Sequence, residues 1–160
     1  MRKKINNNII LTLCVLVLAI ICFLSVNAPI RFQKEQAKRE VTVKQHLLKI
    51  RAAEEKYRKA HSVYTGDFTK LVKEGYLADS LRYIPFSGGK VFALTVSSQI
   101  SKSGRQIPLM ECSAGYYDYL SGLDKNSVNN LIQKANETGR YPGLKIGDIT
   151  TPNDNAGNWE

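Results

Sequence analysis

The sequence predicts an α+β protein: a long amino-terminal helix, its first part transmembrane, packed on a small antiparallel sheet. Three observations predict this fold. Residues 9–26 form an uncharged apolar run, and residues 33–60 contain neither Gly nor Pro, so one helix can continue through them. Residues 90–98 and 106–112 are rich in strand formers and flank a polar connection with Gly104, a pattern typical of a β-hairpin.

The apolar run has the length of a membrane span. At about 1.5 Å per residue, a helix over residues 9–26 nearly matches a hydrocarbon core of roughly 30 Å. Arg2, Lys3 and Lys4 precede it. We therefore expect residues 1–8 to be a cytoplasmic tail and residues 9–27 to be a transmembrane helix.

A cleaved signal peptide is the alternative interpretation, because it also begins with basic residues and an apolar core. Val26-Asn27-Ala28 has small residues at the two positions that a signal peptidase reads. Pro29 follows, however, and is a poor first residue after cleavage. The run is also longer than the roughly 7–15 residues of a signal core. An uncleaved anchor is therefore favoured.

The charges that flank the run leave its orientation nearly balanced. Positive charge favours the cytoplasmic side, but basic residues lie on both sides of the run: Arg2, Lys3 and Lys4 before it, and Arg31, Lys34, Lys38 and Arg39 after it. In the opposite orientation, only the eight-residue tail would be translocated across the membrane, which is unfavourable. We therefore expect a single-pass protein of the inner (cytoplasmic) membrane, with its head on the periplasmic side.

The positive charge is concentrated in the first part of the chain. The net charge is +9 overall; residues 1–61 hold 13 Lys/Arg against 4 Asp/Glu, and residues 62–160 hold 10 of each. A nucleic-acid-binding protein usually carries its basic residues on a folded domain, interleaved with aromatics. Anionic lipid headgroups explain a basic segment beside an anchor better. We expect membrane lipids as partners and no nucleic acid.

Residues 28–61 are predicted to form an amphipathic stem helix. Apolar residues recur at i, i+4 and i+7 along its second half: Val43, Leu47, Ile50, Tyr57 and Ala60. Acid–base pairs at i, i+4 support the helix further: Glu35–Arg39, Glu40–Lys44, Glu54–Arg58 and Glu55–Lys59. The first half should be exposed, and only the second half should pack on a head.

Residues 62–160 are predicted to form a small α+β head. Asp67 is a candidate N-cap for a short helix that ends at Gly75. Beyond the hairpin, the pattern predicts a strand over Leu81–Ile84, a helix over Ser127–Glu137 and an edge strand over Leu144–Ile146. Trp159, one residue from the end of a polar tail, is expected to dock on the head.

No catalytic constellation is present in the sequence, so we expect no enzyme and no cofactor-binding residues. His46 and His61 lie on the stem without metal-ligand spacing. Cys112 is expected to be a buried apolar residue, or else to form an intermolecular disulfide. A cluster of tyrosines after the hairpin is expected to be packed aromatics, or alternatively a stacking platform for a sugar: Tyr116, Tyr117 and Tyr119.

The segment Tyr64–Leu77, YTGDFTKLVKEGYL, follows an apolar anchor and a continuous stem that is rich in Ala and Tyr over residues 50–57. This arrangement resembles bacterial type IV pilins and the major pseudopilins of type II secretion. The resemblance implies a pilin-like fold and a role in assembly. The Asn158-Trp159-Glu160 ending is also similar to that of a family of bacterial single-pass membrane proteins without an assigned activity.

The resemblance also implies an ion site, because major pseudopilins bind calcium in an Asp/Asn-rich loop that ends in Trp. The corresponding residues here are Asp148, Asn153, Asp154 and Asn155. Their oxygens are of the kind that calcium prefers. An ordinary Asn/Gly-rich tail docked through Trp159 is the alternative, so calcium is a possible cofactor and no other is expected.

Two features of pilins are missing. The sequence has no prepilin-peptidase site, and the apolar run lacks the glutamate that pairs pilin subunits. We therefore expect a membrane-anchored structural or assembly subunit of the bacterial envelope, pseudopilin-like in shape, with other envelope proteins as partners. The alternative is a membrane-tethered extracytoplasmic binding module that holds a peptide or glycan at the tyrosine-rich strand end. Exposed apolar surface on the stem favours the first, and a concave aromatic cleft favours the second.

Overall fold

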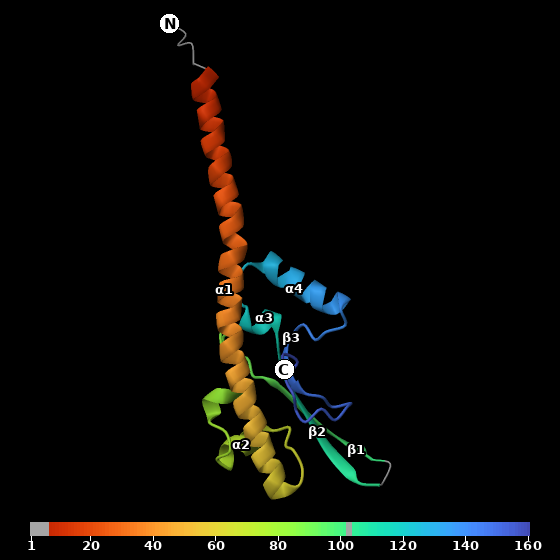
Figure 1. Cartoon of the computed structure of the whole chain (residues 1–160). Helices are drawn as coiled ribbons and strands as arrows, with labels where there is room; N and C mark the ends of the chain where they lie inside the picture. Colours follow the sequence, from red (N-terminus) through yellow and green to blue (C-terminus); the bar gives the residue numbers. More distant parts are fainter. Residues whose placement is uncertain (1–6, 102–103) are drawn as a thin grey trace. The chain divides into compact units, whose positions relative to one another are not determined.

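The computed structural model describes residues 7–101 and 104–160, without the side chains of residues 24, 26 and 28. It confirms the α+β class, with a long amino-terminal helix and a three-stranded antiparallel sheet (Figure 1). Most of the predicted tail, residues 1–6, lies outside the described part. The elements in chain order are α1 (Asn7–His61), α2 (Phe68–Lys73), the 3-10 helix η1 (Asp79–Arg82), β1 (Ala93–Ile100), β2 (Gln106–Gly115), α3 (Tyr116–Tyr119), α4 (Lys125–Glu137) and β3 (Gly143–Gly147).

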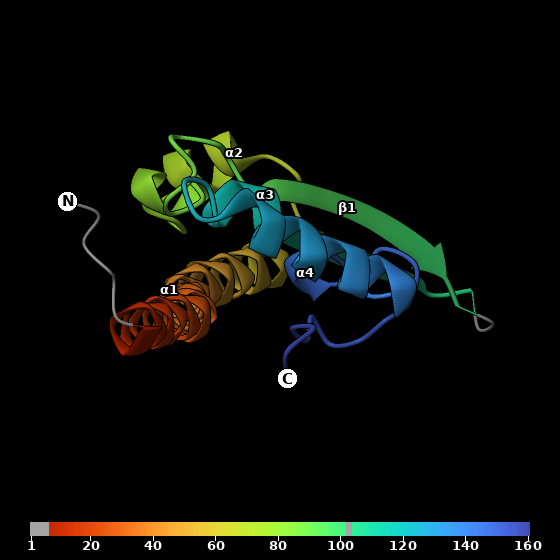
Figure 2. The ribbon, with the colours of Figure 1, turned by 90° about the horizontal axis from the view of Figure 1, so that it is seen from above.

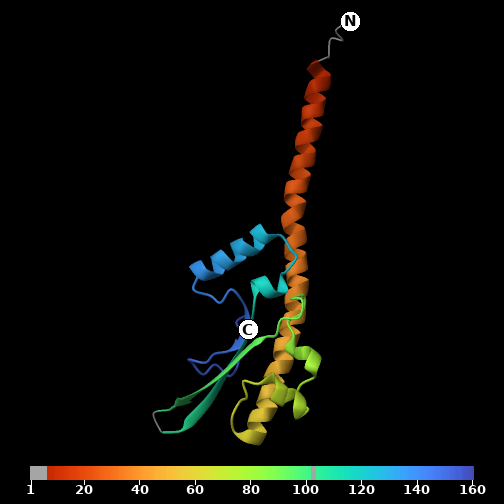
Figure 3. The ribbon, with the colours of Figure 1, turned by 180° about the vertical axis from the view of Figure 1, so that it is seen from behind.

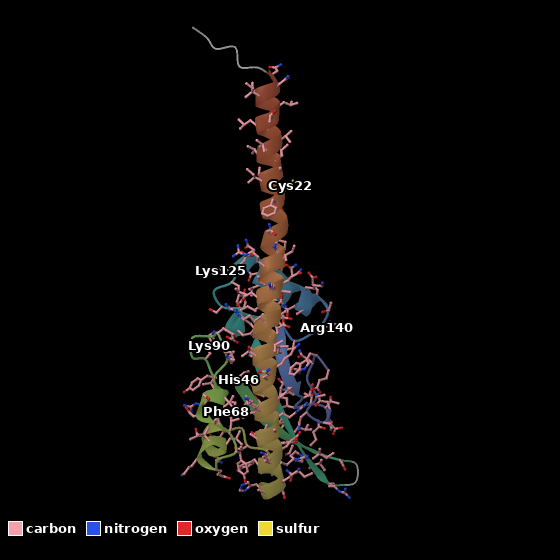
Figure 4. The ribbon with its side chains drawn as sticks, turned by 60° about the vertical axis from the view of Figure 1, so that its left-hand side comes forward. Cys22, His46, Phe68, Lys90, Lys125 and Arg140 are labelled. Atoms are coloured by element: carbon pink, nitrogen blue, oxygen red, sulfur yellow. The ribbon has the colours of Figure 1, made fainter. Side chains whose placement is uncertain are left out.

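The chain divides into two units, residues 1–35 and residues 36–160. In the first unit, α1 carries large apolar side chains on all sides (Figure 4). From Ile9 to Phe23 the exposed fractions of these side chains lie between 47% and 70%. The prediction of a helix over residues 9–27 is confirmed. That of a membrane span is not: within residues 7–101 and 104–160, no helix is found to be long and apolar enough to cross a membrane.

In the second unit, residues 36–61 of α1 bury one face. Val43, Leu47 and Ile50 are fully buried, and Tyr57 is 8% exposed, as the apolar spacing predicts. Ala60 is exposed, so this part of the prediction is wrong. The helix ends at His61, one residue after Ala60, and the chain turns away at Ser62 with a positive φ of 63°.

The sheet has the order β1-β2-β3, and both pairs of strands are antiparallel. Its register pairs Leu94 with Cys112 and Cys112 with Ile146. The central strand β2 is buried mainly over its second half, and Met110 and Cys112 are fully covered. The predicted hairpin is therefore confirmed, although β1 begins three residues later than expected; β1 forms one edge of the sheet (Figure 2).

Two predicted helices are present with their caps. Asp67 Oδ1 accepts a hydrogen bond from the backbone N–H of Thr69 at 2.8 Å, which begins α2. Gly75 follows α2 with a φ of 77°, the left-handed conformation that glycine adopts without strain. Asp124 caps α4 through the backbone N–H of Ser127 at 2.8 Å. Figure 3 shows α2 beside the last turns of α1.

One local prediction is wrong. Residues 81–84 do not form a strand: η1 ends at Arg82, and only Tyr83 makes an isolated bridge, with Val91. An ion pair of 3.1 Å between Arg82 and Asp79, three residues apart, fits the tighter helical turn better than an extended chain. The short helix α3, which follows β2 directly, was not expected.

The predicted pair Glu54–Arg58 is also wrong, because Glu54 points into the core and is fully buried. Its Oε2 accepts a hydrogen bond from the backbone N–H of Thr65 at 2.9 Å, while Oε1 has no partner among the described residues. Burial raises the pKa of this carboxyl to about 7, against the lowering effect of the Thr65 N–H. Arg58 instead places its guanidinium 5.1 Å from the Tyr64 ring centroid. The hydrogen bond between Glu54 and Thr65 thereby holds the segment after α1 against the helix.

The buried face of α1 can be tested with two adjacent leucines. Leu47 is fully buried and Leu48 is 36% exposed. In the full chain held in detergent micelles, Leu47→Asp is expected to lower the free energy of unfolding by roughly 3 kcal/mol or more, because it buries an unpaired carboxyl. Leu48→Asp is the matched control and should cost less than about 1 kcal/mol. Equal effects on chemical denaturation would contradict the packing.

The buried carboxyl predicts a specific pH dependence of stability. The folded-state pKa of Glu54, about 7, exceeds its ordinary value of 4.5. The folded state therefore binds the proton more tightly, and stability falls as the pH rises from about 4.5 through 7. Glu54→Gln should remove this loss and stabilise the protein at pH 8, relative to wild type, by roughly 2–3 kcal/mol, with little effect at pH 4. The neighbouring Glu55 is half-exposed, so Glu55→Gln is the control. The prediction would be refuted if the wild type, Glu54→Gln and Glu55→Gln gave the same denaturation curves at pH 4 and at pH 8.

Candidate functional site

The two edges of the sheet differ in how they are covered. The carboxyl-terminal tail covers β3: Gly147 N–H donates to Ala156 O at 3.0 Å, and Asn158 N–H donates to Lys145 O at 3.0 Å. On the outer side of β1, no backbone hydrogen bond to residues 93–100 is formed by any other described segment. β1 also carries no charged residue and no proline, the features that usually block pairing at an edge. β1 is therefore an open strand edge.

A cleft of about 350 Å³ lies in the unit formed by residues 36–160. It is bounded by α1, α3, α4, β3 and the carboxyl-terminal tail. We call it the aromatic cleft and define it by six of its lining residues: Lys44, Tyr116, Lys134, Arg140, Tyr141 and Trp159. Arg140, which follows α4, is labelled in Figure 4. This is the concave aromatic surface that the binding-module alternative requires.

The tail holds Trp159 in place, so its predicted docking is confirmed. A Cβ at Gly157 would lie 2.7 Å from the Trp159 ring, so only glycine lets the indole fold back over the chain. The Asn158 side chain donates to Gly143 O at 3.0 Å and accepts from Lys145 N–H at 3.2 Å. Arg51 pairs with the Glu160 carboxylate at 3.1 Å. The cleft wall at Trp159 is thereby fixed on both sides.

The structure separates the three predicted tyrosines. Tyr116 lines the cleft, and burial raises the pKa of its hydroxyl, which keeps it a neutral donor. Tyr119 is fully buried, as the packed interpretation expects, and its hydroxyl has no partner among the described residues. Burial is the main cause that raises the pKa of Tyr119, and the charges of Glu40, Tyr116 and Tyr141 raise this pKa further. Tyr117 is 60% exposed and donates to Asn129 Oδ1, outside the cleft.

The aromatic cleft has a positive rim. Lys44 lies 4.0 Å from the Glu40 carboxylate and 5.5 Å from the centroid of the Trp159 ring. Lys134 and Arg140 are exposed, and neither forms an ion pair within the part of the chain that the structure describes. Three cations against one carboxylate give this surface an excess of positive charge.

The four predicted calcium ligands line a second cavity, of about 260 Å³. Asp148, however, already has its oxygens occupied. Its Oδ1 accepts from the backbone N–H of Thr150 at 2.7 Å and of Thr151 at 3.1 Å, and its Oδ2 lies 3.5 Å from the Lys145 ammonium. Hydrogen bonds from Thr150 are the main cause that lowers the pKa of Asp148 to about 2.

The loop that carries the other three candidates has an unusual backbone. Asp154 and Asn155 both adopt positive φ values, 53° and 56°. The Asn155 amide donates to the Tyr64 hydroxyl at 2.7 Å, and its backbone carbonyl accepts from Arg51 at 3.1 Å. No group of three or more His, Cys, Asp or Glu that could hold a metal occurs among the described residues. Calcium binding stays a prediction, and a bound ion would have to compete with Lys145 for Asp148.

The histidines and the cysteine of the head lie among structural side chains. His61 pairs with Glu74 at 3.0 Å and stacks on the Tyr57 ring at 4.2 Å between centroids. His46 is half-buried, with the centroid of its ring 6.4 Å from that of the Phe92 ring. Cys112 is fully buried in β2, as expected, and burial raises the pKa of its thiol.

Sequence reasoning missed most of the cleft. Lys134, Arg140 and Tyr141 were not singled out, because they come from α4 and the turn after it. Lys44 and Trp159 come from the opposite ends of the folded unit. The signal that could have led to the site was Trp159, since an aromatic side chain in a polar tail needs a docking surface. Comparisons with protein-family models, with curated proteins and with solved structures found no match to this chain.

The calcium prediction can be tested by thermal denaturation of the full chain in micelles. If calcium binds the loop of residues 148–155, millimolar calcium should raise the melting temperature by binding linkage. Asp154→Ala should remove that gain, because it deletes one of two carboxylates in the predicted site. Glu137→Ala, an exposed carboxylate on α4, is the control and should keep the gain. Identical melts of the wild type with calcium and with chelator would contradict the site.

Proposed function

We propose that the protein is a membrane-anchored structural or assembly subunit of the bacterial envelope, pseudopilin-like in shape, that works through contacts with other envelope proteins. The observation that carries the proposal is the exposed apolar surface of residues 9–23. Apolar side chains of this number on one exposed helix require a covering environment. A lipid bilayer supplies it.

Lipid fits this segment better than a protein partner does. A helix that packs on one protein partner carries a single apolar stripe, whereas a helix that is apolar all round matches a membrane. Here Leu11 is 70% exposed, Leu13 62% and Phe23 70%, and the run carries no charge. Basic residues precede and follow it, where anionic headgroups would attract them. In this proposal residues 9–27 span the inner membrane once, and the head lies on the periplasmic side.

The open edge of β1 supports an assembly role for the head. An uncharged strand edge pairs readily with an extended segment of another chain. Val96 is 37% exposed and Ile100 80% exposed, so side-chain contacts can accompany the backbone hydrogen bonds. The partner is an envelope protein that presents an extended strand.

The contact at β1 can be tested with photo-crosslinkers in living cells. A probe at Thr95, on the open edge, should form protein adducts, and a control probe at Asn130, exposed on α4, should not. Ser97→Lys should weaken the Thr95 adduct several-fold, because an added charge opposes strand pairing. If Thr95 and Asn130 probes capture the same background, the assembly role is wrong.

The anchor can be tested by mass and by protease access. The full-length protein should keep residues 1–28, because Pro29 is a poor first residue after cleavage. Protease added to spheroplasts should then digest the head. A mature protein that begins near Pro29, or a head that the protease does not reach, would contradict the proposed anchor and orientation.

A second candidate function is a membrane-tethered binding module for a peptide or glycan. The aromatic cleft favours it, because clefts that combine aromatic side chains with a few polar groups are typical ligand sites. Both roles can coexist, since the cleft and the edge of β1 share no residue.

A further inference from the structure

We propose that the aromatic cleft binds a sugar unit that carries a carboxylate. The inference rests on the binding-module candidate and is independent of the assembly role. The cleft volume of about 350 Å³ falls at the lower end of the range of small-molecule sites, which begins at roughly 300 Å³. A space of this size admits one or two sugar rings.

The cations at the rim select an anionic group. Arg140 and Lys134 line the cleft without a carboxylate partner among the described residues. An arginine guanidinium binds a carboxylate through two parallel hydrogen bonds, and a charge-assisted bond is about twice as strong as a neutral one. Lys44 is held near Trp159 and Glu40 and adds a third positive charge. The ligand is therefore expected to carry a negative charge.

The other side chains select a sugar among anionic ligands. Trp159, Tyr116 and Tyr141 line the cleft, and aromatic side chains can pack on the apolar face of a sugar ring. The Glu40 carboxylate can accept hydrogen bonds from the hydroxyl groups of a sugar.

The chain carries its own reporter for the test, because Trp159 is its single tryptophan. The full chain in micelles is titrated with sodium D-glucuronate, with D-glucose and with sodium acetate at constant ionic strength, and Trp159 fluorescence is followed. Glucuronate should give a saturable change, with glucose and acetate at least about tenfold weaker. Arg140→Gln should weaken glucuronate binding about tenfold, the effect of losing roughly 1.4 kcal/mol. The exposed arginine of the hairpin connection provides the control Arg105→Gln, which should bind as wild type.

Several results would overturn the proposal. One is that glucose binds as tightly as glucuronate, and another is that Arg140→Gln binds glucuronate with wild-type affinity. A third is that the dipeptide Ala-Ala binds more tightly than glucuronate. The last is that calorimetry detects no heat of binding with glucuronate up to about 10 mM. A matching melting temperature for Arg140→Gln excludes unfolding as the cause of lost binding. If glucuronate does not bind, the crosslink at Thr95 is still expected, and if that crosslink is absent, glucuronate binding is still expected. The ligand proposal and the assembly proposal can therefore be refuted separately.

Discussion

Four apolar side chains on one face of α1 have at most 2% of their surface exposed: Val43, Leu47, Ile50 and Ala53. The folded unit depends on the burial of this face. Each large aliphatic side chain contributes about 1.5–3 kcal/mol when buried, and a domain is stable by only about 5–15 kcal/mol in total. A sheet of three strands has little apolar surface of its own to bury, so the helix supplies a large share of the core.

Polar contacts fix how the head follows this helix. The Arg39 guanidinium donates to the backbone carbonyls of Tyr119 and Ser121, at 3.1 and 2.8 Å. Arg51 binds Asn155 O and the Glu160 carboxylate. These arginines of α1 thus hold the region after β2 and the carboxyl-terminal tail. The tail then covers β3 and forms a wall of the aromatic cleft, which leaves β1 as the uncovered edge.

Each functional proposal rests on a separate surface of the protein. We propose lipid as the cover for the apolar surface of residues 9–23, an extended protein segment for the edge of β1, and a small anionic ligand for the cleft. In these proposals the protein acts by holding other molecules near a membrane. Residues 36–57 of α1 contribute to the cleft through Lys44 and to the core through Leu47.

Much of the fold could be predicted because it depends on short-range patterns. The apolar spacing of α1, the cap at Asp67 and the hairpin around Gly104 are all local signals. Glu54 shows where such reasoning fails: it lies four residues after Ile50 and seven after Leu47, on the buried face, yet its charge suggested a solvent-exposed ion pair. The backbone N–H of Thr65 that receives it comes from a loop whose path no local pattern reveals. The cleft was missed for a similar reason, since tertiary packing alone brings Lys44 and Trp159 within 5.5 Å.

Hydrogen–deuterium exchange of the full chain in micelles tests the central role of α1 most directly. Amides of residues 43–57 and of β2 should exchange only through global unfolding, because they belong to the same buried core. Amides of residues 58–61, where α1 leaves the core, and those on the open edge of β1 should exchange much faster. Exchange of residues 43–57 as fast as that of residues 58–61 would show that the head folds without the helix, and would contradict this account.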